Sequence, residues 1–174
     1  FFLLCVGRLL PCMLPLFSSA ASDGYKSQGN NCAIGNAYPT FEKPRKYLAP
    51  GLFGPCGYGF PSILGAKIGC PDTPVIGFAG DASVLMNIQE LGTLSQYGLN
   101  VKLIIINNRW QGMVRQWQES FYDERYSSSD MSCGEPDFVK LADSFGVKGY
   151  LISDRKQLQN ELKNALDHDG PALI

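Results

Sequence analysis

The chain has 174 residues, of which 45% are hydrophobic, and its 15 Lys and Arg nearly balance its 16 Asp and Glu, for a net charge of -1. This length and composition predict one domain with a hydrophobic core. The charge balance lacks the basic surface that nucleic-acid-binding proteins carry, so we expect no nucleic-acid partner.

The first 28 residues differ in character from the rest of the chain. This segment begins as an apolar run, but Arg8, Pro11 and Pro15 interrupt it. It is too short and too broken for a membrane span, and no basic region precedes it as in a signal peptide. We therefore expect that residues 1–28 are not part of the fold and come from an incomplete gene read out of frame. The domain is expected to span residues 29–174, without membrane association.

Six cysteines and a single histidine predict no zinc site. No two cysteines form a C-x-x-C pair, and His168 lies in a polar Asp-His-Asp turn that is typical of a solvated surface. We interpret the cysteines as reduced thiols of a cytoplasmic protein, or of a plastid protein if the source is an alga, and not of a secreted one. The cysteines are Cys5, Cys12, Cys32, Cys56, Cys70 and Cys133.

Two turns are expected before the first buried strand. Residues 29–36 form a turn of small and polar residues that includes Asn30 and Asn31. Four glycines between Gly51 and Gly59 indicate positive φ angles or a close approach of the backbone to another group. No strand leads directly into this glycine cluster, so it is not a dinucleotide-binding fingerprint.

A β-α-β unit is predicted in the middle of the chain. Apolar runs at residues 75–79 and 101–106 are short, rich in β-branched residues and bounded by turn residues, as in buried parallel strands. Between them a helix is expected, with Asn87 and Glu90 as a capping pair and Gly98 at its end. The apolar positions of this helix are Leu85, Ile88, Leu91 and Leu94.

Further helices and strands are expected on both sides of this unit. They are a helix over 62–68, a serine-rich and lid-like loop over 121–134, a helix from Pro136 to Gly146, a strand at 147–152, a helix capped by Ser153 or Asp154, and the start of a strand at 172–174. Helices that alternate with strands predict the α/β class. We expect an α/β/α sandwich with a mainly parallel sheet, truncated at its C-terminus.

Polar residues follow both strands of the β-α-β unit. Asp81 comes directly after the first strand, and Asn108 follows the second. Ligands of open parallel sheets bind at the carboxyl ends of the strands, and oxygen ligands without His or Cys suit Mg²⁺ or Ca²⁺. Gly80 and the small Ala82 let backbone N–H groups approach a phosphate. The sequence therefore predicts a site for a metal-bridged diphosphate at this edge.

Gly80-Asp81, a helix, and a strand that ends in Asn107-Asn108 together resemble the thiamine-diphosphate motif. Asp81 and Asn108 are 27 residues apart, which fits that family. The family's usual third residue is Gly, whereas this chain has Ala82, as the acetolactate synthase branch also allows. The resemblance implies thiamine diphosphate and Mg²⁺ as cofactors. It implies Asp81, the side chain of Asn108 and the carbonyl of Trp110 as metal ligands.

The same resemblance implies further site residues. The expected cofactor-binding residues are Asn30, Asn31, Gly54, Cys56, Gly80, Asp81, Ala82, Ser83, Met86, Asn108 and Met113. Cys56 is at the position that wedges the cofactor into a bent shape, with a small buried hydrophobic side chain as the alternative. Met113 and Trp117 share a helical face and are implied to line the substrate entrance, with a core stripe as the alternative. For Asn30 and Asn31 the alternative is a plain turn.

The resemblance differs along the chain. Residues 80–174 resemble the catalytic subunit of acetolactate (acetohydroxyacid) synthase, notably in Asn-Asn-x-x-Gln-Gly-Met-Val-x-Gln-Trp, which begins at Asn107. Residues 29–79 resemble sulfoacetaldehyde acetyltransferase, notably in Gly-Asn-Asn-Cys-Ala-Ile-Gly-Asn-Ala-Tyr and Cys-Gly-Tyr-Gly-Phe-Pro. The chain is then either a divergent member of the superfamily or two gene fragments joined near residues 78–81.

The resemblance implies a transferase of branched-chain amino-acid biosynthesis. It would decarboxylate pyruvate and transfer the two-carbon unit to a 2-keto acid. The activating Glu is expected on a pyrimidine-binding domain of a neighbouring subunit in a homo-oligomer, so no catalytic residue is expected in this chain, and the chain alone should not turn over. The alternatives are a sulfoacetaldehyde acetyltransferase, a cofactor-binding fragment without turnover, and a structural domain in which the motif has decayed.

Overall fold

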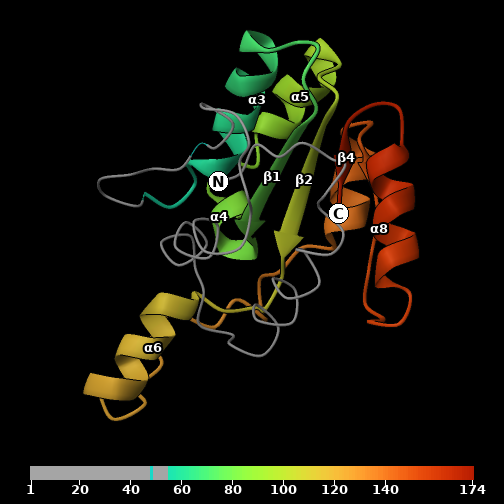
Figure 1. Cartoon of the computed structure of the whole chain (residues 1–174). Coiled ribbons are helices and arrows are strands. Elements are labelled where there is room, and N and C mark those ends of the chain that lie inside the picture. Colours follow the sequence, from blue (N-terminus) through green and yellow to red (C-terminus); the bar gives the residue numbers. More distant parts are fainter. Residues whose placement is uncertain (1–47, 49–54) are drawn as a thin grey trace.

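The computed structural model describes residue 48 and residues 55–174. Asn30, Asn31, Gly54 and the segment 1–28 lie outside the described residues. The elements are α3 Gly59–Gly69, β1 Val75–Gly80, α4 Asp81–Leu85, α5 Glu90–Tyr97, β2 Val101–Ile106, α6 Gly112–Phe121, α7 Phe138–Ser144, β3 Lys148–Gly149, α8 Leu158–Asp167 and β4 Ala172–Leu173 (Figure 1). Among the described residues, no helix combines the length and apolarity that crossing a bilayer requires.

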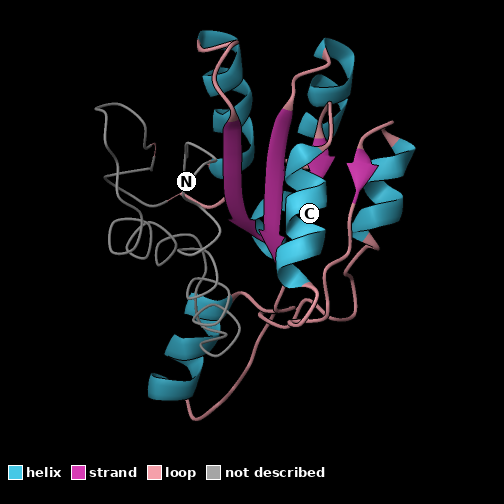
Figure 2. Ribbon diagram, turned by 45° about the vertical axis from the view of Figure 1, so that its right-hand side comes forward, coloured by secondary structure: helices cyan, strands magenta, loops and turns pink. Residues whose placement is uncertain are grey.

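The four strands form a parallel sheet in the order β1-β2-β4-β3. β1 and β2 pair along six residues each, from Val75 opposite Val101 to Gly80 opposite Ile106. Figure 2 shows these two long strands running side by side between helices. The carboxyl ends of β1 and β2 therefore lie side by side, which brings Asp81 and the residues after Ile106 to one edge of the sheet.

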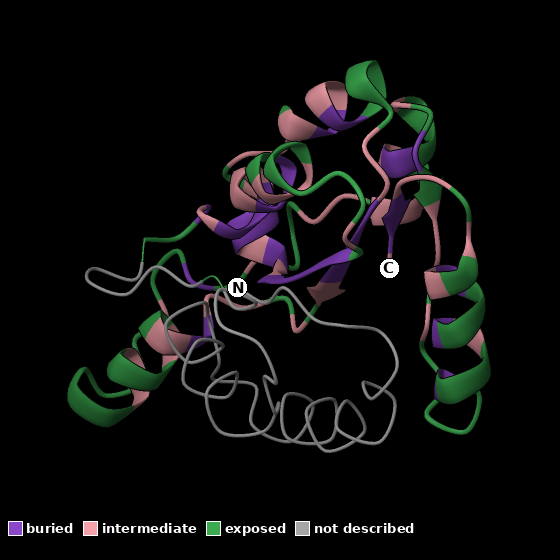
Figure 3. Cartoon of the chain, turned by 45° about the horizontal axis from the view of Figure 1, so that its top comes forward, coloured by how far each residue is buried: buried purple, intermediate pink, exposed green. Residues whose placement is uncertain are grey.

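Alternation along β1 divides the core between the two faces of the sheet. Val75 and Ala79 pack with residues of α3, α4, α5 and α7 on one face. Ile76 and Phe78 pack with Leu162 of α8 on the other face. Figure 3 colours much of the strands and parts of the helices as buried. This two-faced packing confirms the predicted α/β class with helices on both sides of a parallel sheet.

The helix between β1 and β2 begins differently from the sequence prediction. It is two helices, α4 and α5, joined by i→i−3 hydrogen bonds over residues 86–92. Asn87 and Glu90 are not a capping pair, because the N-cap of α5 is Gln89 and it makes no side-chain cap bond. The Asn87 side chain instead donates to the Gly57 carbonyl, 30 residues earlier. Gly98 ends α5 at φ 56°, as predicted.

Three boundaries in the C-terminal part also differ. Pro136 does not start α7: the helix begins at Phe138, because the carboxylate of Asp137 accepts the N–H groups of Val139 and Lys140. The strand expected at 147–152 is only β3, since its partner β4 offers two residues for pairing. Ser153 and Asp154 do not cap α8, which starts at Leu158 after Gln157. The Asp154 carboxylate accepts the N–H of Lys156 in a turn before the helix.

Candidate active site

Asp81 lies at the junction of β1 and α4, with only 3% of its surface exposed. Its Oδ2 atom is buried and has no hydrogen-bond partner among the described residues. Burial raises the pKa of this carboxyl above its ordinary value, hydrogen bonds with the backbone of Ala82 and Arg109 oppose that rise, and the charge of Glu135 adds to it. A buried carboxylate oxygen without a partner is costly, so a cation is the group that best fits this position.

The segment after β2 turns sharply beside Asp81. The Asn107 Oδ1 accepts the N–H of Arg109 at 3.1 Å, and the Asn108 Oδ1 accepts the N–H of Trp110 at 3.0 Å. Arg109 adopts a positive φ of 61°, which costs about 1 kcal/mol for a residue with a Cβ. These overlapping turns reverse the chain at the edge of the sheet. The side-chain oxygen of Asn108 is a neutral oxygen ligand of the kind that Mg²⁺ accepts.

Trp110 is held on both its backbone and its ring. The N–H of Gln111 donates to the Ser129 carbonyl at 2.9 Å, and the N–H of Met131 donates to the Arg109 carbonyl at 2.8 Å. These two bonds form the antiparallel β-bridge between Trp110 and Asp130, and neither of them uses the Trp110 carbonyl. The implied third metal ligand therefore belongs to a fixed segment of backbone.

Arg115, on α6, packs on the indole of Trp110. Its guanidinium carbon lies 4.1 Å from the centre of the Trp110 ring and 5.4 Å from that of Tyr126. The two rings also meet edge to face at 5.4 Å. Cation–π contacts of this kind contribute about 0.5–2 kcal/mol each. Arg115 thus ties α6 to the turn that carries Trp110.

Glu135 is a site residue that the sequence analysis did not identify. Its Oε2 lies 2.8 Å from the Nε of Arg109, and its Oε1 accepts the side-chain N–H of Asn107. Its side chain is 11% exposed. The residues on either side of Asn108 are thus both bound to one carboxylate. No local pattern marks Glu135, since it lies 28 residues after Asn107 in an irregular segment.

A second cluster joins α4 to the glycine-rich segment. The N–H of Gly57 donates to the Ser83 Oγ at 3.0 Å, and Asn87 Nδ2 donates to the Gly57 carbonyl at 2.8 Å. Gly57 has a φ of 84°, and a Cβ there would lie 2.5 Å from Asn87 Nδ2 and 3.3 Å from the Cβ of Met86. The structure thus brings Ser83 and Met86 to the turn that carries Cys56. Cys56 and Met86 are exposed at this surface, so Cys56 is not a small buried side chain.

The glycine before Asp81 leaves space for a ligand. A Cβ on Gly80 would meet no described atom within 4 Å. Ala82, which follows Asp81, is half-buried and has only a methyl side chain, which adds little bulk. The backbone at Gly80 is therefore open to the approach of another group, and the phosphate expected here stays a prediction.

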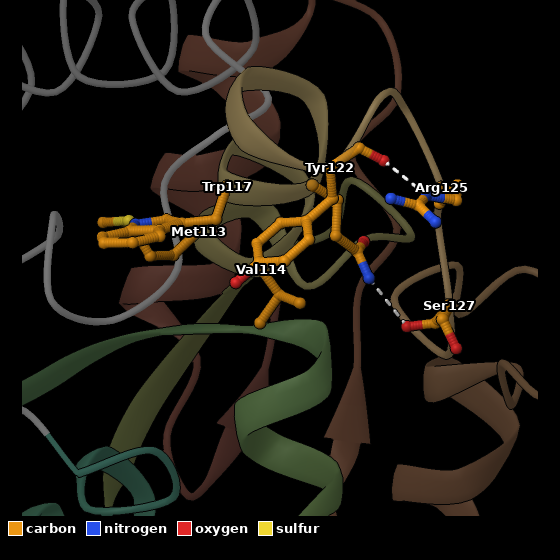
Figure 4. A pocket seen from close by; sticks show the side chains of 7 residues that line it. Met113, Val114, Trp117, Tyr122, Arg125 and Ser127 are labelled. Atoms are coloured by element: carbon orange, nitrogen blue, oxygen red, sulfur yellow. Dashed lines mark hydrogen bonds between the residues drawn. The ribbon is translucent and has the colours of Figure 1, made fainter.

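The implied substrate-entrance residues lie on α6, which projects beyond the carboxyl ends of β1 and β2 (Figure 1). Trp117 is 56% exposed, so the alternative of a core stripe is wrong for it. Met113 and Trp117 line an open pocket of about 590 Å³ (Figure 4). Hydrogen bonds from the Gln118 side chain to the Ser127 carbonyl and from Arg125 Nε to the Tyr122 carbonyl hold its far wall. The helix presents an apolar face to solvent.

Comparison with protein families identifies the domain. Residues 27–174 match the thiamine pyrophosphate enzymes, in their C-terminal TPP binding domain. The chain belongs to this family. Thiamine pyrophosphate is another name for thiamine diphosphate, so this match confirms the cofactor class that the spacing of Asp81 and Asn108 suggested.

Curated relatives fall into the two groups that the sequence resembles. The chain is 57% identical over 131 residues to the acetolactate synthase large subunit of Parasynechococcus marenigrum, and 52% identical over 132 residues to that of Pyropia yezoensis. It is 41% identical over 169 residues to a probable sulfoacetaldehyde acetyltransferase of Rhizobium meliloti. These matches cover 75%, 76% and 97% of this chain, but only 21%, 22% and 28% of the relatives. The chain thus spans between about a fifth and three tenths of their length.

A solved structure supports the fold. The thiamine diphosphate-dependent 4-hydroxybenzoylformate decarboxylase of Rhodococcus jostii RHA1 superposes with a TM-score of 0.76 at 27% sequence identity. The superposition covers 92% of this chain and 31% of that one. The similarity extends over nearly all of the present chain, which supports the assignment of the fold to a thiamine-diphosphate-binding domain.

Proposed function

We propose that this domain binds the diphosphate of thiamine diphosphate through Mg²⁺ in an acetolactate synthase. The single observation that carries the metal is the buried Oδ2 of Asp81, which has no hydrogen-bond partner among the described residues. Asp81 would supply the charged ligand, and Asn108 and the Trp110 carbonyl the neutral ones. Three oxygens completed by phosphate and water match the preference of Mg²⁺. Its charge would offset the desolvation that raises the pKa of Asp81.

The residues around the metal would bind and orient the cofactor. When bound, thiamine diphosphate supplies the electron sink for cleavage of a 2-keto acid. Ser83 and Asn87 fix the Gly57 turn, and with it Cys56, at the surface beside α4. The exposed face with Met113 and Trp117 would border the path of the substrate.

The proposed reaction is decarboxylation of pyruvate and transfer of the two-carbon unit to a second 2-keto acid, a step of branched-chain amino-acid biosynthesis. The support is the 57% identity to an acetolactate synthase large subunit. The remaining parts of the site, including the activating Glu, would come from a pyrimidine-binding domain of a neighbouring subunit in a homo-oligomer. The domain alone is therefore proposed to bind cofactor weakly and to form no acetolactate.

A sulfoacetaldehyde acetyltransferase is the second candidate. It is favoured by the relative from Rhizobium meliloti, whose alignment extends over 169 residues instead of 131. The choice needs a complete enzyme that carries this domain. Consumption of pyruvate with formation of acetolactate supports the first candidate, and consumption of sulfoacetaldehyde supports the second.

Calorimetry of the 174-residue chain with Mg²⁺ and thiamine diphosphate tests the metal site. Asp81→Ala should abolish metal-dependent binding, because it removes the only proposed ligand with a charge. The matched control is Asp143→Ala, whose carboxylate is exposed on α7. Unchanged binding by Asp81→Ala would refute the proposed function. Steady acetolactate formation by this chain would refute the claim that the chain alone does not turn over.

A further inference from the structure

Glu135 is connected to both neighbours of the proposed ligand Asn108. One carboxylate oxygen accepts the side-chain N–H of Asn107, and the other pairs with Arg109 at 2.8 Å. The carboxylate is largely buried, with 11% of the Glu135 side chain exposed, whereas Arg109 is 65% exposed. Of the two partners in this ion pair, Glu135 is therefore the one whose side chain is held by its surroundings.

The turn that Glu135 contacts has a strained backbone. Arg109 is one of four described non-glycine residues with a positive φ. The side-chain oxygens of Asn107 and Asn108 each accept a backbone N–H from two residues later, and these bonds favour the reversal of the chain after β2. Strained backbone of this kind persists where the surrounding structure holds it.

The segment that carries Glu135 is itself bound to the turn. The backbone bonds of Gln111 to Ser129 and of Met131 to Arg109 bring residues 129–131 alongside the residues after β2. Glu135 follows four residues later, just before the Asp137 cap of α7. The Glu135 carboxylate thus comes from the loop before α7, and it connects that loop to the edge of the sheet where Asp81 lies.

Stability alone does not explain this arrangement. A pair between a carboxylate and an exposed arginine contributes about 0–1 kcal/mol. Glu135 binds the turn after β2, and Asp81 follows β1 directly, so both carboxylates belong to one edge of the sheet. Like charges at one edge repel each other, and a divalent cation bound there would attract both.

We propose that Glu135 is a positioning residue for the metal, which holds Asn107 and Arg109 so that Asn108 and the Trp110 carbonyl are presented to a divalent cation on Asp81. This inference rests on the proposed function. Outer-shell partners of metal ligands typically change metal affinity by about 10–100-fold when they are removed. We expect a loss of that size for Glu135→Ala, without a matching loss of thermal stability.

The test uses Mn²⁺, which accepts the same oxygen ligands and is counted directly by the electron paramagnetic resonance signal of the free ion. The 174-residue chain is titrated with Mn²⁺ in the presence of excess thiamine diphosphate. Glu135→Gln keeps the shape of the side chain and an acceptor for Asn107, but it loses the ion pair with Arg109. We expect the affinity order wild type, Glu135→Gln, Glu135→Ala. The control Glu161→Gln makes the same chemical change in the first turn of α8 and should bind as wild type does.

A double-mutant cycle with Asn107→Ala separates positioning from charge. If Glu135 acts through Asn107, the double variant Asn107→Ala, Glu135→Ala should lose less affinity than the two single losses combined. Equal losses for Glu135→Gln and Glu135→Ala, or additive losses in the cycle, would overturn the positioning role. So would wild-type affinity in Glu135→Ala. If wild type and Asp81→Ala bind Mn²⁺ alike, the proposed function itself fails, and this result is distinct from all of the others.

Discussion

Asp81→Asn should stabilise the metal-free protein at neutral pH. The change keeps the shape of the side chain and removes its charge, and Asp81 is only 3% exposed. In the wild type the Oδ2 atom has no described hydrogen-bond partner. Leaving a buried acceptor unpaired costs about 1–3 kcal/mol, and more if it is charged. For a domain of this size, each kcal/mol corresponds to about 2–4 °C in the melting temperature Tm.

The pH dependence has a definite sign. Because the pKa of Asp81 is raised in the folded state, the folded protein keeps its proton at pH values where the unfolded chain has lost it. The stability of the wild type should therefore fall as the pH rises above the ordinary value of 3.8, until the folded carboxyl has ionised. Asp81→Asn lacks this loss. The gap between the two proteins should be small near pH 3 and complete at pH 7.

Metal should reverse the order of stability. Mg²⁺ together with thiamine diphosphate at 100 times the dissociation constant adds about 2.7 kcal/mol to the wild type, and it should add nothing to Asp81→Asn. Differential scanning calorimetry at pH 3 and pH 7, with and without these ligands, measures all of these values. The control Asp143→Asn removes an exposed carboxylate and should leave Tm unchanged. If Asp81→Asn is no more stable than wild type at pH 7 without metal, the cost assigned to the buried charge is wrong.

Three further variants test other contacts. Asn108→Ala should weaken metal binding less than Asp81→Ala, because a neutral ligand is lost; calorimetry giving the opposite order would contradict the assigned roles. Trp117→Leu should change the free energy of unfolding by about 0.5 kcal/mol or less, since the side chain is 56% exposed, while altering substrate affinity in a complete enzyme. Gly57→Ala should destabilise by about 1–2 kcal/mol, because its φ of 84° disfavours a Cβ that would also meet Asn87. Denaturant unfolding measures this loss, and a stability equal to wild type would exclude the strain.

The sequence predicted what short segments determine. The apolar runs in β1 and β2 are unambiguous because each is buried on both faces of the sheet. Gly98 ended its helix because the left-handed cap is a local property. These local features placed Asp81 and Asn108 at the same edge before any contact was known. The fold class follows from them, whereas the cofactor class came from the resemblance of this motif to the thiamine-diphosphate family.

Contacts between distant segments could not be predicted. Asn87 and Glu90 have the spacing of a capping pair, but the Asn87 amide binds the Gly57 carbonyl, which no local pattern encodes. Glu135 lies in a segment that reads only as loop, and its partners precede it by more than 20 residues. The strand expected at 147–152 was too long for the same reason, because β3 pairs with β4 along only two residues. In each case tertiary contacts outweighed local preference.

The features that the sequence could not predict are also the ones that oppose stability in the absence of a ligand. The first is the burial of Asp81 with an oxygen that has no described hydrogen-bond partner. The second is the left-handed conformation of Arg109, and the third is the repulsion between the charges of Glu135 and Asp81. Each of these costs free energy, and all three surround the same edge of the sheet. A divalent cation bound to Asp81 would offset the first and the third together, because it attracts both carboxylates at once. The second keeps Asn108 and Trp110 ready to complete the coordination, so that little ordering remains to be done when the metal binds.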